Sequence, residues 1–392
     1  MNRSIRLLLF AKSLDGGTGT FVLNFLAIEK LFRKGDLIIK TLVLERPSFR
    51  KIRSNNFSYW TSPKYYPEKY TPSLNNVFKF VKEIFWFRKH INTFSPNVVL
   101  TIDSHCLLLS EVTKLIYRKK FKTIVTMHNN LKEVISVKST FYLHWILRRI
   151  LKFLLNRADK VVCVSQMLSQ NLHRFFELKR LPTTIYNGLS LKRGRPKTFP
   201  TGKVIILSIA RFAEQKDHET LLKAFALLNR SKPGSELWLA GEGPLKKGLT
   251  RLADSLGLKH SVKFLGWRQN PNRLINKSHV FVLSSKREGF GYVLIEAMSQ
   301  GIPVVSSDVP FGPREILEDG KYGILVPPGK PDALKNAILK ILTKRFYNYY
   351  SRVGLFRPNF FSREKMLRNY KELILETLDG DSRTPRKARV IK

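Results

Sequence analysis

Apolar runs of strand length recur along the chain and are separated by segments with helical periodicity. In the first half these runs lie at residues 4–10, 37–44, 97–102, 123–127, 160–165 and 183–185. In the second half they lie at residues 204–209, 236–240, 261–265, 279–284, 302–306 and 323–326. Strands that alternate with helices at this spacing indicate βαβ units. The pattern therefore predicts an α/β fold built on parallel sheets.

Helical periodicity fills most of the segments between these runs. We expect helices over residues 20–33, 75–90, 140–156, 217–229, 245–256 and 362–377, and a glycine turn at residues 14–19 before the first of them. Residues 45–73 are polar, aromatic and proline-bearing, and they predict a long loop that orders on a ligand.

One basic, proline-bearing segment without periodicity, residues 189–202, divides two series of βα units. A chain of 392 residues is long for a single core. We therefore predict an N-terminal Rossmann-like domain and a C-terminal one, followed by a helical segment that crosses back to the first domain and a basic tail expected to be disordered. The predicted bounds are 1–190, 191–202 for the linker, 203–345, 346–378 and 379–392.

The stretch EGFGYVLIEAMSQG, residues 288–301, carries two carboxylates eight residues apart. Glu288 falls in a glycine-rich turn between a strand and a helix, and Glu296 falls inside that helix. Backbone amides at a glycine-rich helix start attract phosphate. A carboxylate further along can accept both hydrogen bonds of a ribose diol. A nucleotide-sugar pocket fits this chemistry; the alternative is an ordinary βαβ unit with solvent-facing glutamates.

Two cations follow the first strand of the second series. Arg211 comes just after that strand and Lys216 lies five residues later, before a helix. Ligands of open parallel sheets bind at the carboxyl ends of the strands, and a guanidinium with an ammonium suits a diphosphate there. The alternative is that both are further surface charges of a basic protein.

These features together resemble the retaining glycosyltransferases of the GT-B fold, and specifically glycosyltransferase family 4. Four stretches of the second half carry the resemblance: RFAEQKD at 211–217, LAGEGPL at 239–245, VKFLGW at 262–267 and EGFGYVLIEAMSQGIPVV at 288–305. In the first half the fitting stretches are GG at 16–17, TMHN at 126–129, ADKVVCVS at 158–165 and IYNG at 185–188. The segment DVPFGPREIL at 308–317 is similar to members that build bacterial surface glycans, including members that use UDP-linked N-acetylhexosamines.

The resemblance implies two Rossmann-like domains that face each other across a cleft, with the donor mainly on the C-terminal domain. It assigns Arg211 and Lys216 to the donor diphosphate and Glu288 to the donor sugar. The remaining implied positions are backbone amides at Gly289, Phe290 and Gly291 for sugar and phosphate, Glu296 for the ribose, Gly17 near the diphosphate from the first domain, and His128 near the sugar.

No cofactor and no metal are expected, because in GT-B enzymes cationic and amide donors at the diphosphate stand in for a divalent ion. A metal-dependent GT-A enzyme would want a D-x-D site. The chain has one at residues 379–381, which we interpret as a turn at the end of the last helix. No nucleophile emerges from the sequence, so the retaining outcome rests on the resemblance.

The chain is strongly basic: it has 70 lysines and arginines against 29 acidic residues, which gives a net charge of +41. Such a charge favours anionic partners, although it also fits a compositional bias of the source organism. The two cysteines give no disulfide framework and no metal-ligand spacing, which suits a reducing compartment. No apolar stretch is long enough to span a membrane, and the first run is a strand rather than a signal peptide. We therefore expect a cytoplasmic protein.

Residues 75–90 and 140–157 mix aromatic side chains with lysines and arginines. They indicate a first domain that binds peripherally to the anionic inner face of the cytoplasmic membrane. The alternative is that both helices pack inward and leave only basic outer faces.

The function predicted from the sequence is retaining transfer of a hexose or N-acetylhexosamine, with UDP-sugar as the expected donor. The expected acceptor is a glycan or a lipid-linked glycan in lipopolysaccharide, capsule or exopolysaccharide synthesis. One alternative is a nucleotide-sugar epimerase on the same fold. Another is a basic nucleic-acid-binding protein, which no zinc-site, helix-turn-helix or aromatic recognition-strand signature supports.

Overall fold

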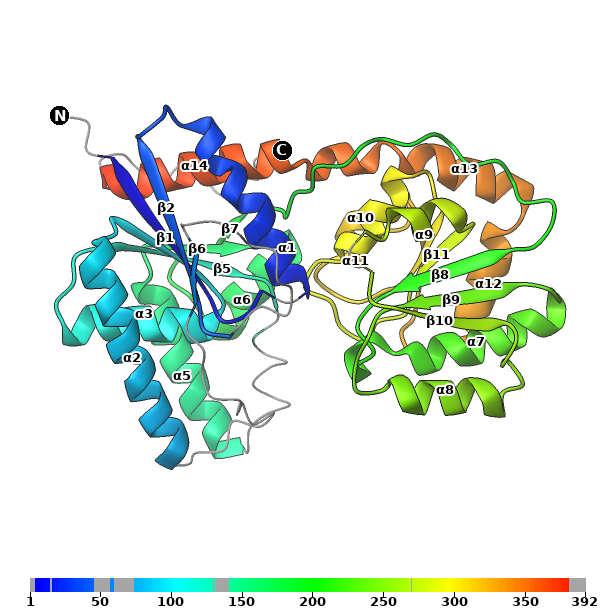
Figure 1. The fold of residues 1–392 in the computed structure, drawn as a ribbon, viewed down its shortest axis with the longest axis horizontal. Coiled ribbons are helices and arrows are strands. Elements are labelled where there is room, and N and C mark those ends of the chain that lie inside the picture. The colour runs from blue at the N-terminus through cyan, green and yellow to red at the C-terminus, as the bar shows by residue number, and fades with distance from the viewer. Residues whose placement is uncertain are drawn as a thin grey trace. The chain divides into compact units, whose positions relative to one another are not determined.

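The computed structural model describes residues 4–14, 16–45, 57–59, 74–129, 131, 141–268 and 270–380 (Figure 1). The chain forms two compact units. The first consists of the chain up to Gly188 together with the segment from Arg363 onward, and the second is Leu189–Ser362. Each unit is an α/β layer structure with one parallel sheet, as the alternating pattern predicts.

The described strands of the first unit form a seven-stranded sheet in the order β3-β2-β1-β4-β5-β6-β7, and every pair in it is parallel. Its strands are β1 (Ile5–Ala11), β2 (Leu37–Val43), β3 (Phe57–Tyr59), β4 (Val98–Ile102), β5 (Lys122–Met127), β6 (Lys160–Cys163) and β7 (Thr183–Thr184). Its helices are α1 (Gly16–Phe25), the 3₁₀ helix η1 (Leu26–Leu31), α2 (Leu74–Phe94), α3 (Ser104–Ile116), α5 (Phe141–Arg157), α6 (Gln166–Phe176) and α14 (Arg363–Asp379).

Strand β1 shows why this sheet needs helices on both faces. Alternate residues of a strand point to opposite faces. Leu7 and Leu9 pack into one core with residues of α1 and α14, among them Tyr370. Leu8 and Phe10 pack into a second core with residues of α2 and α3, among them Phe87. A strand that is apolar throughout is therefore buried on both sides, as expected for a parallel sheet.

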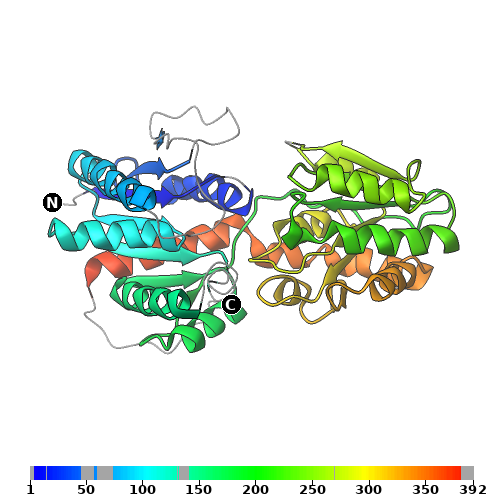
Figure 2. The same cartoon turned by 90° about the horizontal axis from the view of Figure 1, so that it is seen from below.

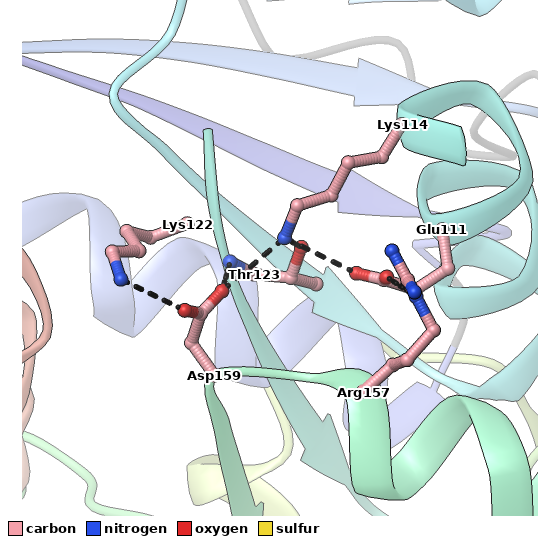
Figure 3. A network of polar contacts seen from close by, with 6 residues as sticks. All are labelled: Glu111, Lys114, Lys122, Thr123, Arg157 and Asp159. Atoms are coloured by element: carbon pink, nitrogen blue, oxygen red, sulfur yellow. Dashed lines mark hydrogen bonds and ion pairs between the residues drawn. The ribbon is translucent and has the colours of Figure 1, made fainter. Parts of the chain in front are cut away.

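A polar network ties α3, β5, β6 and α5 together at the amino ends of the strands (Figure 3). The Asp159 carboxylate accepts hydrogen bonds from the Thr123 amide at 2.8 Å, from Lys122 Nζ at 3.0 Å and from Lys114 Nζ at 3.3 Å. Burial opposes ionisation of Asp159, but these three donors outweigh it and lower the pKa of the carboxyl. Arg157 Nε donates to the buried Glu111 carboxylate at 3.1 Å, which anchors the end of α5 on α3.

The second unit has a six-stranded parallel sheet in the order β10-β9-β8-β11-β12-β13. Its strands are β8 (Ile205–Ile209), β9 (Glu236–Ala240), β10 (Val262–Gly266), β11 (Val280–Leu283), β12 (Val304–Ser307) and β13 (Ile324–Val326). Its helices are η2 (Glu214–Lys216), α7 (His218–Ser231), α8 (Lys246–Ser255), α9 (Asn272–Lys277), α10 (Tyr292–Ser299), α11 (Pro313–Leu317), α12 (Pro331–Ile341), α13 (Lys344–Gly354) and η3 (Arg357–Phe361).

The first helix begins earlier than its predicted start near residue 20. Helix α1 starts at Gly16, so the predicted glycine turn at 14–19 is largely the first turn of this helix. A Cβ atom at Gly19 would lie 1.8 Å from the carbonyl oxygen of Leu14, so only glycine lets the helix start this close to β1. The α-helix then ends at Phe25, and η1 takes over much of the predicted helical range.

The structure shows to which unit the predicted linker and the C-terminal helices belong. Residues 192–202 have no regular secondary structure, yet the Gly194 amide donates to Ser299 O at 2.7 Å and the segment belongs to the second unit. Helix α13 and η3 belong to the second unit, whereas α14 belongs to the first. The predicted tail beyond residue 380 and most of the predicted loop 45–73 lie outside the described residues.

Candidate functional site

The carboxyl ends of β8, β9 and β11 bring the predicted donor residues of the second unit to one edge of its sheet. Arg211 follows β8, and its loop rests on the turn after β9. A Cβ atom at Gly241 would lie 2.0 Å from Ala210 O, and one at Gly243 would lie 2.4 Å from Phe212 O. The two glycines of the LAGEGPL stretch are therefore needed for close backbone contact on both sides of Arg211.

Lys216 and Glu288 form a direct ion pair, although 72 residues separate them. Lys216 Nζ lies 2.6 Å from Glu288 Oε1, and the Ser285 hydroxyl donates to the same oxygen at 2.6 Å. The Ser284 hydroxyl donates to the carbonyl oxygen of Lys216 at 3.0 Å. Glu288 Oε2 accepts no hydrogen bond from the described residues, so one oxygen of this carboxylate remains available to a ligand.

Gln215 links the loop after β8 to the loop after β11 through two hydrogen bonds. Its backbone carbonyl accepts a hydrogen bond from the Lys286 amide at 2.8 Å, and its side-chain Nε2 donates to Arg287 O at 2.8 Å. Asp217 caps α7 by accepting from the Thr220 amide and hydroxyl, and Lys286 Nζ lies 3.7 Å from Asp217 Oδ1. These contacts fix the backbone on both sides of the Lys216–Glu288 pair.

The glycine-rich turn before α10 offers unused hydrogen-bond donors. Among the described residues, no acceptor receives the backbone amides of Gly289, Phe290 or Gly291. Gly291 has φ of +106° at the N-cap of α10, a conformation that favours glycine. The Phe290 ring is buried against Tyr292 and Phe361, so only its backbone faces the turn. Free amides at a helix N-terminus provide an anion-binding position.

Glu296 lies within α10 as a partly buried carboxyl group that none of the described residues hydrogen-bonds. Burial raises its pKa from 4.5 to about 7. An acid without a donor in a desolvated place resists ionisation, and a ligand that supplies two hydroxyl donors would relieve that cost. A vicinal diol is a ligand of this kind.

Arg211 completes the set of groups at this edge. Its side chain is exposed and makes no ion pair within the described part of the chain. The edge therefore combines one free guanidinium, one ammonium with donors to spare, three free amides and two carboxylates. A diphosphate joined to a sugar and a ribose would match each of these groups with an opposite partner.

Gly17 and His128 belong to the first unit, at the carboxyl ends of β1 and β5. Gly17 is exposed in the first turn of α1. The His128 ring packs edge-on to Phe21 of α1 with centroids 4.7 Å apart. Its Nε2 lies 3.3 Å from the Thr126 hydroxyl, to which Tyr370 of α14 also donates at 3.1 Å. Burial lowers the pKa of His128 to about 3, so the ring is neutral at physiological pH.

Sequence reasoning missed the residues that hold these groups in place, namely Ser284, Ser285, Gln215, Phe21 and Tyr370. A hydroxyl three residues before a turn glutamate is a signal for Ser285, whereas no local pattern marks Gln215. His105, which carried no predicted role, lies 2.9 Å from the buried carboxylate of Glu83. Within the described ranges no three His, Cys, Asp or Glu side chains gather in a group able to hold a metal ion.

Two family models match the chain. Residues 192–354 match "Glycosyl transferases group 1" and residues 50–193 match "Glycosyltransferase Family 4". An uncharacterized glycosyltransferase of Methanocaldococcus jannaschii is 29% identical over 354 residues, which is 77% of this chain and 84% of that protein. A 4-alpha-N-acetylgalactosaminyltransferase of Campylobacter jejuni that acts on a diphospho-undecaprenol-linked sugar is 25% identical over 320 residues, which is 78% of this chain and 84% of that protein.

Solved structures show the same fold. The apo lipopolysaccharide outer core galactosyltransferase WaaB aligns over 95% of this chain and 99% of its own, with a TM-score of 0.73 and 19% identity. Anabaena HepE in complex with UDP and glucose aligns over 95% of this chain and 100% of its own, with a TM-score of 0.74 and 20% identity. The predicted α/β fold of the GT-B type is confirmed. The two matching models run together from residue 50 to residue 354, and the chain belongs to glycosyltransferase family 4.

Proposed function

We propose that this glycosyltransferase transfers a hexose or N-acetylhexosamine from a UDP-sugar, with retention of the anomeric configuration, to a glycan or lipid-linked acceptor. The observation that carries the proposal is the edge of the second unit's sheet, where Arg211, Lys216 and three free amides stand beside the free carboxyl of Glu296. The side chains of Arg211 and Glu296 and the three amides have no partner among the described residues, and Lys216, which pairs with Glu288, keeps further donors, so each group could bind one part of a nucleotide-sugar.

Cleavage of the sugar–phosphate bond leaves negative charge on the diphosphate and positive charge on the sugar ring. Arg211, Lys216 and the amides of Gly289–Gly291 would hold the diphosphate and stabilise the charge of the departing UDP. Glu288 would accept a hydroxyl of the donor sugar through its free Oε2, while Oε1 stays bound to Lys216 and Ser285. Glu296 would accept the two ribose hydroxyls.

We assign Gly17 to donor binding and His128 to the sugar on the strength of the family resemblance and of their places at the carboxyl edge of their own sheet. A neutral His128 can donate or accept a hydrogen bond but supplies no positive charge, because its pKa lies near 3. For retention we propose attack of the acceptor from the same face that UDP leaves, since the sequence offers no protein nucleophile.

Two observations support a surface-glycan pathway. The Campylobacter relative is named for transfer to a lipid-linked oligosaccharide, and WaaB for the lipopolysaccharide outer core. HepE, with UDP and glucose bound, supports UDP as the nucleotide. On the same grounds we propose lipopolysaccharide, capsule or exopolysaccharide synthesis as the setting, on the cytoplasmic side and in peripheral contact with the membrane. None of the described helices is long and apolar enough to span a bilayer.

We propose that no cofactor and no metal ion is needed, because Arg211 and Lys216 supply the positive charge that a divalent ion would bring to the diphosphate. Nucleic acid is not an expected partner, since the basic residues are spread over the chain rather than gathered in a recognition motif.

A thermal-shift screen with UDP-, GDP- and ADP-sugars tests the donor, because a ligand that binds only the folded state raises the melting temperature. We expect the largest shift with a UDP-sugar and its loss in Lys216→Ala and Glu296→Ala. Normal turnover in both variants would overturn the site assignment. Incubating the bound donor with membrane lipid extract then separates transfer to an acceptor from the isomerised free donor that an epimerase would release.

A further inference from the structure

Helix α2 carries apolar side chains both on the side that packs on the sheet and on a second, exposed side. Its inner side buries Ile84, Phe87 and Ile91 against the sheet. Its outer side exposes Phe78 by 65%, Val81 by 41% and Phe85 by 56%. Positions separated by three, four and seven residues share one face of a helix, so these three side chains form a stripe. A helix that only covers a sheet needs no such stripe.

Helix α5 repeats this feature. Trp145, Ile150 and Phe153 are exposed by 51%, 41% and 56%. Arg149 lies over the Trp145 ring at 4.6 Å and Arg157 over the Phe153 ring at 5.8 Å. The helix FYLHWILRRILKFLLNR carries four cationic residues and no acidic residue. Its exposed side therefore alternates aromatic and cationic side chains.

The two stripes lie on the same helical layer. Helix α3 packs against α2 on one side and against α5 on the other, and the three helices run side by side over one face of the sheet (Figure 2). Neighbouring packed helices are about 8–10 Å apart, so the stripes are within reach of one flat partner. We call Phe78, Val81, Phe85, Trp145, Ile150 and Phe153 together the α2–α5 face.

The positive charge of α2 and α5 indicates which kind of partner binds the α2–α5 face. Helix α2 holds four lysines and arginines against one glutamate, and α5 holds only cations. A second copy of the chain would bring the same positive charge, whereas a bilayer with anionic headgroups is complementary. Helices that carry aromatic rings and long cationic side chains on one face bind at the boundary between lipid headgroups and acyl chains. Single exposed apolar residues are ordinary, but six on one layer mark an interaction surface.

We propose that the α2–α5 face docks on an anionic phospholipid bilayer. The rings of Phe78, Phe85 and Trp145 enter the headgroup boundary, and the neighbouring lysines and arginines contact lipid phosphates. The proposal deepens the proposed function by naming the surface and the lipid chemistry of its membrane contact. It does not depend on the identity of the sugar.

Flotation of the full-length chain with vesicles tests the proposal. The probes are phosphatidylcholine vesicles and vesicles of equal parts phosphatidylcholine and phosphatidylglycerol. We expect binding to the anionic vesicles at low salt, and a loss of affinity of about tenfold or more in the double variant Phe78→Ser/Phe85→Ser. The matched control is Tyr349→Ser, which removes an aromatic side chain of similar exposure from the second unit and should bind as the parent does. Removing exposed side chains leaves the cores intact.

Trp145 provides a second measurement on the same face. Phospholipids brominated on their acyl chains should quench tryptophan emission of the parent, and Trp145→Phe should remove most of that quenching. Absence of binding to anionic vesicles, or equal binding by the double variant and the control, overturns the proposal. A parent that is dimeric in solution and a double variant that is monomeric would also overturn it in favour of self-association. The shift in melting temperature with UDP-sugar should stay unchanged in these variants; its absence in the parent would contradict the proposed function and not the membrane face.

Discussion

Replacing Glu296 by glutamine is expected to stabilise the ligand-free protein at alkaline pH while weakening its affinity for a UDP-sugar. Burial raises the pKa of Glu296 from 4.5 to about 7. Between these two values the folded protein keeps a proton that the unfolded chain has lost, so the free energy of unfolding falls as pH rises. The cost is absent below about pH 4.5 and complete above pH 7.

The size of this effect follows from the shift. One pKa unit corresponds to about 1.4 kcal/mol, so the shift sets an upper bound of roughly 3 kcal/mol. Water that reaches the partly exposed carboxyl reduces this figure, and we expect about 1–3 kcal/mol at pH 8. Glutamine has the same shape and no charge. For a unit of this size the melting temperature should rise by about 2–4 °C per kcal/mol.

Donor binding should respond to pH in the opposite direction. The ribose hydroxyls hydrogen-bond best to the ionised carboxylate, so the affinity of the parent for a UDP-sugar should fall as pH drops below 7, approaching tenfold per unit. The glutamine variant should bind more weakly at pH 8 and lose this dependence on pH. A UDP-sugar is the better probe because its diphosphate does not change charge in this range, whereas free UDP does.

Thermal denaturation at pH 5 and pH 8 and calorimetric titration at pH 6, 7 and 8 measure both effects. Glu242→Gln is the matched control, because that side chain is half exposed and, among the described residues, pairs with Lys246 alone on the surface. A difference in melting temperature that is the same at pH 5 and pH 8 would show that burial does not hold the Glu296 proton. Unchanged affinity at pH 8 would refute the ribose contact, whatever the stability data show.

Two further substitutions probe the Lys216–Glu288 pair of the second unit, and a third probes the polar network of the first unit. Lys216→Ala should lower kcat/KM with a UDP-sugar by about a hundredfold or more. The substitution removes a cation from the leaving diphosphate and leaves the nearly buried Glu288 carboxylate without its ion-pair partner. Steady-state kinetics that match the parent would contradict this role. Ser285→Ala should lower kcat/KM roughly tenfold through loss of the 2.6 Å bond to Glu288, and Ser285→Thr should restore most of it, whereas no rescue would indicate a packing role. Asp159→Asn should cost about 1–3 kcal/mol of unfolding free energy at pH 7. Because the pKa of Asp159 is lowered from 3.8, denaturant titrations should show that this cost persists above pH 4 and shrinks as pH falls further. A cost that is constant down to pH 2 would refute the charge network.

Apart from β3, which lies within the segment 45–73 predicted as a loop, the strands of both sheets were predictable because a strand buried on both faces is apolar along its whole length. Three of the helices that were not predicted have a clear physical reason. Helices α11 and α12 begin with Pro313 and Pro331 at the first helical position, where proline is favourable, so a proline that suggests a loop in the sequence marks a helix start here. Helix α3 is buried on most sides, because it packs between α2 and α5, and its run of apolar residues lacks the polar face that reveals a surface helix.

The predicted residues of the second unit's site do lie at one edge of one sheet, but their mutual contacts were beyond the sequence. Lys216 and Glu288 were assigned to different parts of the donor, the diphosphate and the sugar. In the structure they bind each other at 2.6 Å. A contact between loops 72 residues apart depends on the strand order, which places β8 beside β11, and no local pattern encodes that order.

Under the proposed function, the ion pair between Lys216 and Glu288 would let one site serve both parts of a donor. An ammonium has three donors, and Glu288 takes one of them, so two remain for phosphate oxygens. Glu288 in turn commits Oε1 to Lys216 and Ser285 and keeps Oε2. Each residue thus holds the other in place and still has hydrogen-bonding groups left for a ligand. Because both side chains are already ordered, donor binding would not carry the entropic cost of ordering them. The pair also places the cation for the leaving group beside the acceptor for the sugar, so bond cleavage would begin between two groups whose spacing is already set.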